Sequence, residues 1–288
     1  MPRPVTARPS VTPIDFQGIE AYHLQAASGA SAIVSGYGAQ VLSWVPPDGV
    51  ERLFLSERAK FDGSAAIRGG VPVCFPQFSG LGSLPKHGLV RQRPWQIDSE
   101  QARDDYALLT LTTASDEASR TLWPHDFRAE LTVVLEGQRL DIELGVDNTG
   151  PCEFAFTAAL HTYLQVWEVE EITLQGLRGY EYRDAANHDE IRKERHSELV
   201  VDAEMDRVYH GVAQPLLLRD NGRSLGIHAE SFPDVVVWNP WETHCATLPD
   251  MARLDFRHML CVEAAVARAP VTLAAGASWW GRQTLVAL

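Results

Sequence analysis

The feature that most constrains the fold is a long succession of short β-compatible runs with no helical pattern between them. From residue 20 onward, apolar and β-branched runs alternate with turn residues at intervals of about ten residues. The clearest pair is residues 127–136 and 139–148, which Gly137 and Gln138 join as a hairpin. Apolar and polar residues alternate along the second run. The sequence therefore predicts an all-β fold of large antiparallel sheets packed as a sandwich.

The length and composition of the chain are compatible with one domain. All-β sandwiches often reach 288 residues as a single unit. The hydrophobic share of 45% and the charged share of 22% are typical of a globular protein. No repeat of fixed period and no long polar linker divides the chain. We predict a flexible tail over residues 1–15, where several prolines oppose a regular element, and one domain over residues 16–288.

The charge of the chain limits its partners. The formal net charge is −13 at pH 7, whereas nucleic acids and anionic membranes require a basic face. No apolar run is long enough to span a membrane, and residues 1–13 lack the apolar segment of a signal peptide. The four cysteines are far apart and show no metal-ligand spacing. We expect a reduced, cytoplasmic protein that binds a small molecule and is a monomer rather than an obligate oligomer.

The least regular stretch of the chain is IRGGVPVCFPQFSGLGSLPKHGLVR, residues 67–91. It contains five Gly and three Pro, and Pro removes backbone donors whereas Gly weakens helices and strands. The stretch is also apolar, which argues against disorder, and it carries four basic side chains: Arg68, Lys86, His87 and Arg91. Long loops in compact domains are often functional. This loop is therefore either the cationic wall of a binding site or a packed surface loop with solvated arginines.

Two residues in apolar runs are candidates for acid–base chemistry. His161 lies in FTAALHTYL, where a single histidine is more often a core or surface residue than a catalyst. Glu263 lies between Val262 and Ala264, so that both faces of its strand are apolar. Burial raises the pKa of a carboxyl toward neutrality, as a general base requires. The alternative for Glu263 is an edge strand from which the side chain points to solvent.

Other polar and aromatic residues are less specific. Asp206, in EMDRVY, is compatible with a structural ion pair. Trp238 and Trp241 offer flat faces that pack equally well on sugar rings or within a core. The histidines have no zinc-ligand spacing, and the chain has no nucleophile elbow, no phosphate-binding-loop lysine and no dinucleotide fingerprint. We therefore predict neither a metal site nor a cofactor.

Several motifs occur in one order along the chain: IRGGVPVCFP (67–76), KHGLVR (86–91), ALHTY (159–163), MDRVY, VVWNPW and CVEA (261–264). Together they resemble the aldose 1-epimerase (mutarotase) superfamily, and most closely its hexose-6-phosphate branch, that of the glucose-6-phosphate 1-epimerases. The resemblance extends from about residue 20 to the C-terminus. It implies a galactose-mutarotase-like super β-sandwich and a cofactor-free isomerase that interconverts the α and β anomers of a hexose 6-phosphate.

The resemblance also implies the two catalytic residues. Glu263 corresponds to the general base that takes the proton of the C1 hydroxyl, and His161 corresponds to the general acid that protonates the ring oxygen. Both groups must then lie within hydrogen-bond reach of the sugar and have pKa values near the working pH. Their separation of 102 residues along the chain (263 − 161) is compatible with this, because different strands of one sheet can face the same pocket.

Five further residues are implied as substrate-binding. Arg68 and Arg91 correspond to the positions that hold the sugar phosphate, which favours guanidinium donors. Asp206 corresponds to an aspartate that accepts hydrogen bonds from sugar hydroxyls, and His87 to a second pocket histidine. Lys86 departs from the family, where Gln is common at this position. Its ammonium either adds to phosphate binding or faces solvent.

Three other functions stay open at this point. A mutarotase for a non-phosphorylated aldose differs only in the cationic cluster of Arg68, Arg91 and Lys86. A non-catalytic carbohydrate-binding sandwich requires exposed aromatic platforms but no acid–base pair. A glycoside hydrolase requires two carboxylates that flank the scissile bond, which Asp206 and Glu263 could supply, but His161 would then have no role.

Overall fold

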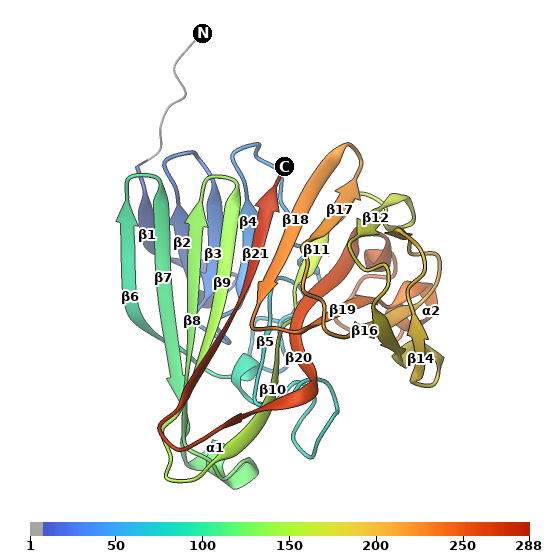
Figure 1. The fold of residues 1–288 in the computed structure, drawn as a ribbon. Helices are drawn as coiled ribbons and strands as arrows, with labels where there is room; N and C mark the ends of the chain where they lie inside the picture. The colour runs from blue at the N-terminus through green and yellow to red at the C-terminus, as the bar shows by residue number, and fades with distance from the viewer. Residues whose placement is uncertain (1–7) are drawn as a thin grey trace.

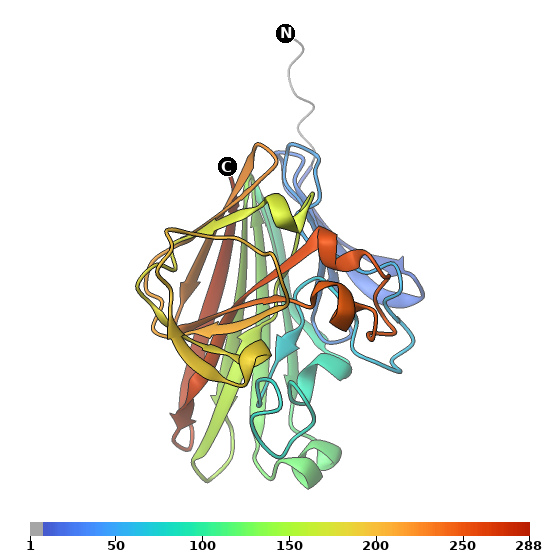
Figure 2. The same ribbon diagram turned by 90° about the vertical axis from the view of Figure 1, so that its right-hand side faces the viewer.

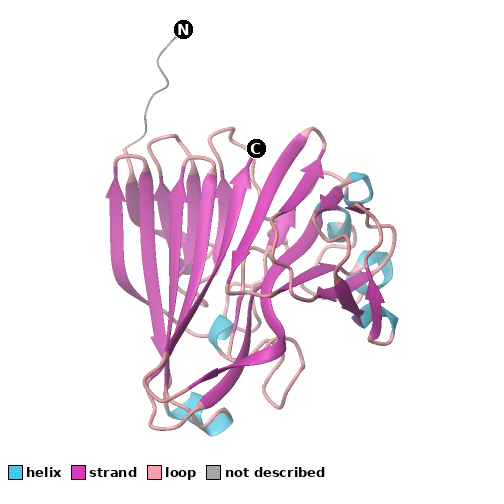
Figure 3. Ribbon diagram, viewed as in Figure 1, coloured by secondary structure: helices cyan, strands magenta, loops and turns pink. Residues whose placement is uncertain are grey.

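A computed structural model describes residues 8–288, and strands form most of it (Figures 1 and 3). The strands make three antiparallel sheets of four, nine and eight strands. In Figure 1 the four-stranded sheet lies behind the nine-stranded sheet, and the eight-stranded sheet extends to their right. Figure 2 is turned so that this right-hand side faces the viewer. The antiparallel all-β sandwich predicted from the sequence is confirmed.

The sheets and helices have the following bounds. The four-stranded sheet has the order β1 (Ser10–Phe16), β2 (Ile19–Gln25), β3 (Ser31–Ser35), β4 (Val41–Val45). The nine-stranded sheet has the order β15 (Glu198–Leu199), β12 (Thr173–Gln175), β17 (Leu216–Asp220), β18 (Arg223–Glu230), β21 (Ser278–Ala287), β9 (Arg139–Asn148), β8 (Phe127–Glu136), β7 (Tyr106–Ala114), β6 (Gln96–Arg103). The eight-stranded sheet has the order β14 (Glu190–Lys193), β13 (Glu181–Asp184), β16 (Met205–Tyr209), β19 (Asp234–Asn239), β20 (Met259–Leu273), β10 (Phe154–Leu160), β5 (Val73–Cys74), and β11 (Tyr163–Gln165) also pairs with β20.

Helices are short and few among the described residues. The α-helices are α1 (Glu117–Leu122) and α2 (Trp241–Cys245), and the 3-10 turns are η1 (Val90–Gln92), η2 (Val169–Glu171), η3 (Ala185–Asn187) and η4 (Asp255–His258). Within residues 8–288, no helix is long and apolar enough to cross a membrane.

One large hydrophobic core is shared by the three sheets. In the β8–β9 hairpin, Leu131 lies opposite Leu144 and Val133 lies opposite Ile142, and all four side chains are buried. The alternation of apolar and polar residues along these strands thus places one face against the core, as the sequence predicts. The single domain over residues 16–288 stays a prediction, which the shared core supports.

The N-terminal segment differs from the flexible tail predicted over residues 1–15. Residues Ser10–Phe16 form β1, which pairs with β2 along its whole length; residues 1–7 lie outside the described part. Pro13 is compatible with this strand because β1 is the edge of its sheet, where a missing N–H does not interrupt a ladder. The tail prediction is therefore wrong for residues 10–15.

The irregular stretch 67–91 is packed against the sandwich. Gly70 donates its N–H to the Phe54 carbonyl at 2.7 Å, and Val71 donates to the Val41 carbonyl at 2.8 Å. Gly70 has a φ of +58°, and a Cβ at this position would lie 2.1 Å from the Val41 oxygen. Only glycine therefore allows the loop to lie this close to β4. This contact fixes the start of the loop that carries Arg68.

We expect Gly70→Ala to destabilise the protein strongly, because the new methyl group meets backbone that cannot move aside. The loss in the free energy of unfolding should be at least about 2 kcal/mol, measured by urea denaturation. Gly29→Ala is the matched control, since Gly29 also has positive φ (+91°) but has no atom within 4 Å of the place that a Cβ would occupy. Its cost should be about 1 kcal/mol. Equal losses for the two variants would contradict the packing argument.

Candidate active site

The candidate site lies on one face of the eight-stranded sheet, where β16, β19, β20 and β10 follow one another. Residues that are directly opposite in neighbouring strands point to the same face. The register pairs Glu263 on β20 with Val236 on β19, and Asp206 on β16 with Trp238 on β19. Val236 and Trp238 are two residues apart, so they share a face. Both carboxyl groups therefore lie on this face.

His161 lies at the break between β10 and β11, and the break places it opposite Glu263. The register against β20 continues across the break, as the flanking pairs show: Leu160 with Ala264, and Tyr163 with Cys261. On the other side, the backbone N–H of His161 donates to the Pro72 carbonyl at 2.9 Å. The 67–91 loop thus flanks the segment that carries His161.

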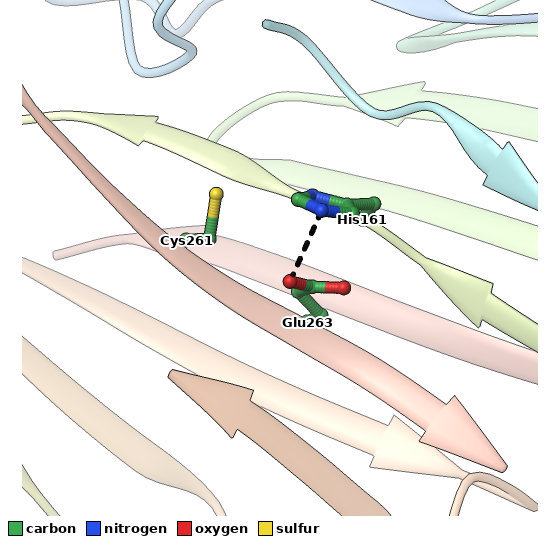
Figure 4. Close-up of side chains that lie close together, drawn as sticks. All are labelled: His161, Cys261 and Glu263. Carbon is green, nitrogen blue, oxygen red and sulfur yellow. Dashed lines mark ion pairs between the residues drawn. The ribbon is translucent and has the colours of Figure 1, made fainter. Parts of the chain in front are cut away.

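His161 and Glu263 form a buried pair (Figure 4). Nε2 of His161 lies 3.3 Å from Oε1 of Glu263, and the residues are 8% and 2% exposed. Burial raises the pKa of the Glu263 carboxyl well above its usual range, and the nearby Asp206 charge adds to this. Burial lowers the pKa of His161, and His87 and nearby arginines act in the same direction. Both shifts favour the neutral forms of the two groups, the carboxylic acid and the imidazole.

His87 packs beside this pair as a neutral imidazole. Its ring lies edge-on to the His161 ring, with centroids 5.2 Å apart. The Ser79 backbone N–H donates to Nδ1 of His87 at 3.3 Å, so Nδ1 is an acceptor and Nε2 carries the proton. Burial, reinforced by nearby cations, lowers the pKa of His87 to about 3. His87 is therefore a hydrogen-bond donor of fixed tautomer rather than a cation.

Arg68 is held by two neighbours. Its Nε and Nη2 donate to the two carboxylate oxygens of Asp250, both at 3.1 Å, and its Nη1 donates to the Tyr163 hydroxyl at 3.0 Å. The Tyr163 ring in turn stacks on His161, with centroids 4.8 Å apart and planes 13° apart. A bidentate pair of this kind fixes the orientation of the guanidinium. Its remaining N–H groups are available to a ligand.

These residues line a cavity of about 330 Å³, which is in the range of ligand pockets. Three cationic side chains line it, those of Arg68, Lys86 and Arg183. Burial raises the pKa of the Asp206 carboxyl, an effect that the charges on Arg183 and Lys86 oppose. The other lining residues are Phe78, Ser79, Gly80, Leu81, His87, His161, Ala185, Val236, Trp238, His244, Leu248 and Glu263.

The structure brings together nearly all of the residues that the sequence indicates. The ones that line the cavity are Arg68, Lys86, His87, His161, Asp206 and Glu263. Arg91 does not line it: its Nη2 donates to the Lys86 carbonyl at 2.8 Å. Arg91 thus braces the turn that carries Lys86 and His87. Of the two tryptophans, Trp238 lines the cavity, whereas Trp241 packs on Phe256.

Sequence reasoning gave no role to several residues of the site. Arg183 and His244 line the cavity, and Asp250 holds Arg68. Arg183 lies in the charged segment EYRD and also forms an ion pair with Asp189, a pattern typical of any surface strand. Asp250 is 182 residues from its partner, so no local spacing could indicate the pair.

Comparisons with known proteins identify relatives of this chain. The aldose 1-epimerase family model matches residues 20–285. A relative from Cenchrus ciliaris named "putative glucose-6-phosphate 1-epimerase" is 35% identical over 284 residues, which cover 94% of this chain and 85% of the relative. A relative of the same name from Salmonella typhimurium is 32% identical over 237 residues, covering 81% of this chain and 79% of the relative.

Solved structures show the same fold. A Salmonella typhimurium protein described as a "putative mutarotase" is 28% identical, with a TM-score of 0.89 and coverage of 100% of this chain and 95% of that chain. A galactose mutarotase-like protein from Clostridium acetobutylicum is 14% identical, with a TM-score of 0.78 and coverage of 98% and 99%. The galactose-mutarotase-like sandwich implied by the sequence resemblance is confirmed. The chain belongs to the aldose 1-epimerase family.

Proposed function

We propose that this protein is an isomerase that interconverts the α and β anomers of a hexose 6-phosphate, as a glucose-6-phosphate 1-epimerase. The observation that carries the proposal is the buried pair of His161 and Glu263, 3.3 Å apart in a cavity lined by three cationic side chains. The name of the relatives from Cenchrus ciliaris and Salmonella typhimurium supports the phosphorylated substrate.

The pair supplies the two proton transfers that ring opening requires. Glu263 as carboxylate takes the proton of the C1 hydroxyl while His161 as imidazolium gives a proton to the ring oxygen, and the bond between C1 and the ring oxygen breaks. Rotation about the C1–C2 bond of the free aldehyde exposes its other face, and closure reverses both transfers. Because burial favours the neutral pair, the carboxyl proton of Glu263 first passes to His161 across the 3.3 Å between Oε1 and Nε2, and the reverse transfer restores the neutral pair after ring closure.

Other cavity residues hold the sugar phosphate in place. The guanidinium of Arg68 and the ammonium of Lys86 are suited to the phosphate, and Arg183 adds a third positive charge on the cavity wall. Asp206 accepts hydrogen bonds from sugar hydroxyls, and the Nε2–H of His87 donates one. Arg91 contributes through the turn that it braces rather than by lining the cavity.

A mutarotase for a non-phosphorylated aldose is the second candidate, and one observation favours it. Asp250 already neutralises Arg68 through a bidentate pair, which reduces the charge that Arg68 offers to a phosphate. Lys86 and Arg183 would then carry the phosphate selectivity. The buried acid–base pair argues against a carbohydrate-binding module without catalysis, because binding alone does not require two buried titratable groups.

We place this activity in the cytoplasm, in a monomer that does not bind nucleic acids or membranes. The four cysteines are free, which suits a reducing compartment. The net charge of −13 disfavours polyanionic partners. The reaction as derived uses only side chains of this chain and requires no cofactor.

Glu263→Gln should lower the rate of anomer exchange by about 10²- to 10⁴-fold, because the amide cannot take the hydroxyl proton. Saturation-transfer NMR of glucose 6-phosphate at equal protein concentrations measures the rate. Glu51→Gln is the matched control, since burial also raises the pKa of Glu51, but Glu51 lies outside the cavity lining. Its rate should stay close to that of the unmodified protein. A Glu263→Gln rate within a factor of two of that value would exclude Glu263 as the base.

The same Glu263→Gln variant should be more stable than the unmodified protein. The folded state raises the pKa of Glu263 above its value in the unfolded chain, about 4.3. The folded protein therefore holds this proton more tightly, and its stability falls as pH rises above that value. Gln does not ionise, so its advantage in thermal midpoint should grow from pH 4 toward neutrality. A midpoint that is lower at neutral pH would contradict the assigned pKa shift.

Arg68→Lys should discriminate between the two candidate substrates. Lysine keeps the charge but loses the bidentate donors, and a charge-assisted hydrogen bond contributes about 1.5–3 kcal/mol. The KM for glucose 6-phosphate should therefore rise about tenfold or more, whereas exchange of free glucose should change little. Equal effects on both sugars would assign Arg68 to the sugar ring and favour the non-phosphorylated substrate.

A further inference from the structure

One buried group beside the catalytic pair has no part in the proposed reaction. Cys261 precedes Glu263 by two residues on β20, so both side chains point to the same face of the sheet. Cys261 is fully buried. The sulfur of Cys261, a ring nitrogen of His161 and a carboxylate oxygen of Glu263 all lie within 4.8 Å of one another. Figure 4 shows the contact between His161 and Glu263, with Cys261 beside them on the strand that carries Glu263.

The spacing of these atoms suits a tetrahedral metal ion. In a tetrahedral zinc site, an imidazole nitrogen and a carboxylate oxygen lie about 3.4 Å apart, and a thiolate sulfur lies about 3.6 Å from the nitrogen. The distance between Nε2 of His161 and Oε1 of Glu263 is 3.3 Å. The sulfur lies within 4.8 Å of both, and a closer approach of the sulfur would complete three corners of the tetrahedron.

A second observation also points to a ligand at this place. Oε2 of Glu263 is buried and has no hydrogen-bond partner among the described residues, although Glu263 is only 2% exposed. An unpartnered oxygen on a buried carboxylate is costly, and a divalent cation bound by this carboxylate would offset the cost. Zinc with one thiolate and one carboxylate forms a neutral set, which suits a buried site. Because His161 and Glu263 line the cavity, an ion can enter from it, and a water in the cavity can supply the fourth ligand.

We propose that His161, Cys261 and Glu263 bind a zinc ion, and that the ion inhibits the enzyme by occupying both catalytic groups. The thiol proton and the proton held by the pair leave to solvent as the ion binds. The ligands come from β20 and from the break between β10 and β11, which is why the sequence shows no zinc spacing and predicts no metal site. Ion binding is independent of the proposed function; only the inhibition depends on it.

Binding is tested with cobalt(II), which binds at zinc sites and gives a characteristic absorption band when a thiolate is one of its ligands. Titration of the purified protein should produce an absorption band of thiolate-to-cobalt charge transfer, and added zinc should remove it. The band should be lost in Cys261→Ala and in the closer mimic Cys261→Ser, with folding checked by circular dichroism. It should remain in Cys152→Ser, the control for the exposed cysteine. No band in the unmodified protein, or a band that survives both Cys261 variants, would overturn the site.

Inhibition is tested separately by anomer exchange of glucose 6-phosphate with increasing zinc. Each variant is compared with its own metal-free rate. Zinc should inhibit competitively with the sugar, a chelator should restore the rate, and Cys261→Ser should weaken inhibition at least about tenfold. A cobalt band together with uninhibited exchange would overturn the inhibitory role and keep the metal site. A cobalt band in a protein without epimerase activity would disprove the proposed function alone.

Discussion

The register of β10 and β11 against β20 is the constraint on which the site depends. This register places His161 directly opposite Glu263, although the two residues are 102 positions apart in the chain (263 − 161). Burial dominates the charge state of both groups, raising the pKa of Glu263 and lowering that of His161. A slip of one residue would turn one of the two side chains to the opposite face of the sheet. The chemistry thus depends on strand pairing first and on side-chain identity second.

The cavity combines rigid and adjustable charges. Arg68 is fixed by Asp250 and Tyr163, and Tyr163 stacks on His161, so one wall of the cavity is preorganised. Lys86, in contrast, is exposed, and its backbone carbonyl accepts a hydrogen bond from Arg91. A fixed guanidinium gives orientation at low entropic cost on binding, whereas a flexible ammonium gives charge without strict geometry. The buried unpartnered groups are costly to stability, which is common where a site must remain ready for a ligand.

The sequence predicted what is local and missed what depends on long-range contacts. The hairpin of residues 127–148 follows from its own alternation, and the family resemblance indicated His161 and Glu263 as the candidate acid and base. The strand through Pro13 was missed because a proline is acceptable on an edge, and edges are not visible in a sequence. Asp250 and Cys261 were missed for another reason: each matters only through partners on other segments. Arg91 is the opposite case: the resemblance implied that it binds the phosphate, but its guanidinium donates a hydrogen bond to the Lys86 carbonyl.

The most direct test of the central claim is anomer exchange by the unmodified protein itself. Saturation-transfer NMR would compare the exchange of glucose 6-phosphate, glucose and galactose with and without the protein, against the spontaneous rate of each sugar. The account predicts acceleration that is largest for the phosphate. Acceleration of free sugars alone would keep the acid–base pair but contradict the role of the cationic cavity wall. No acceleration of any sugar would contradict the central claim that His161 and Glu263 act as an acid–base pair on a pyranose.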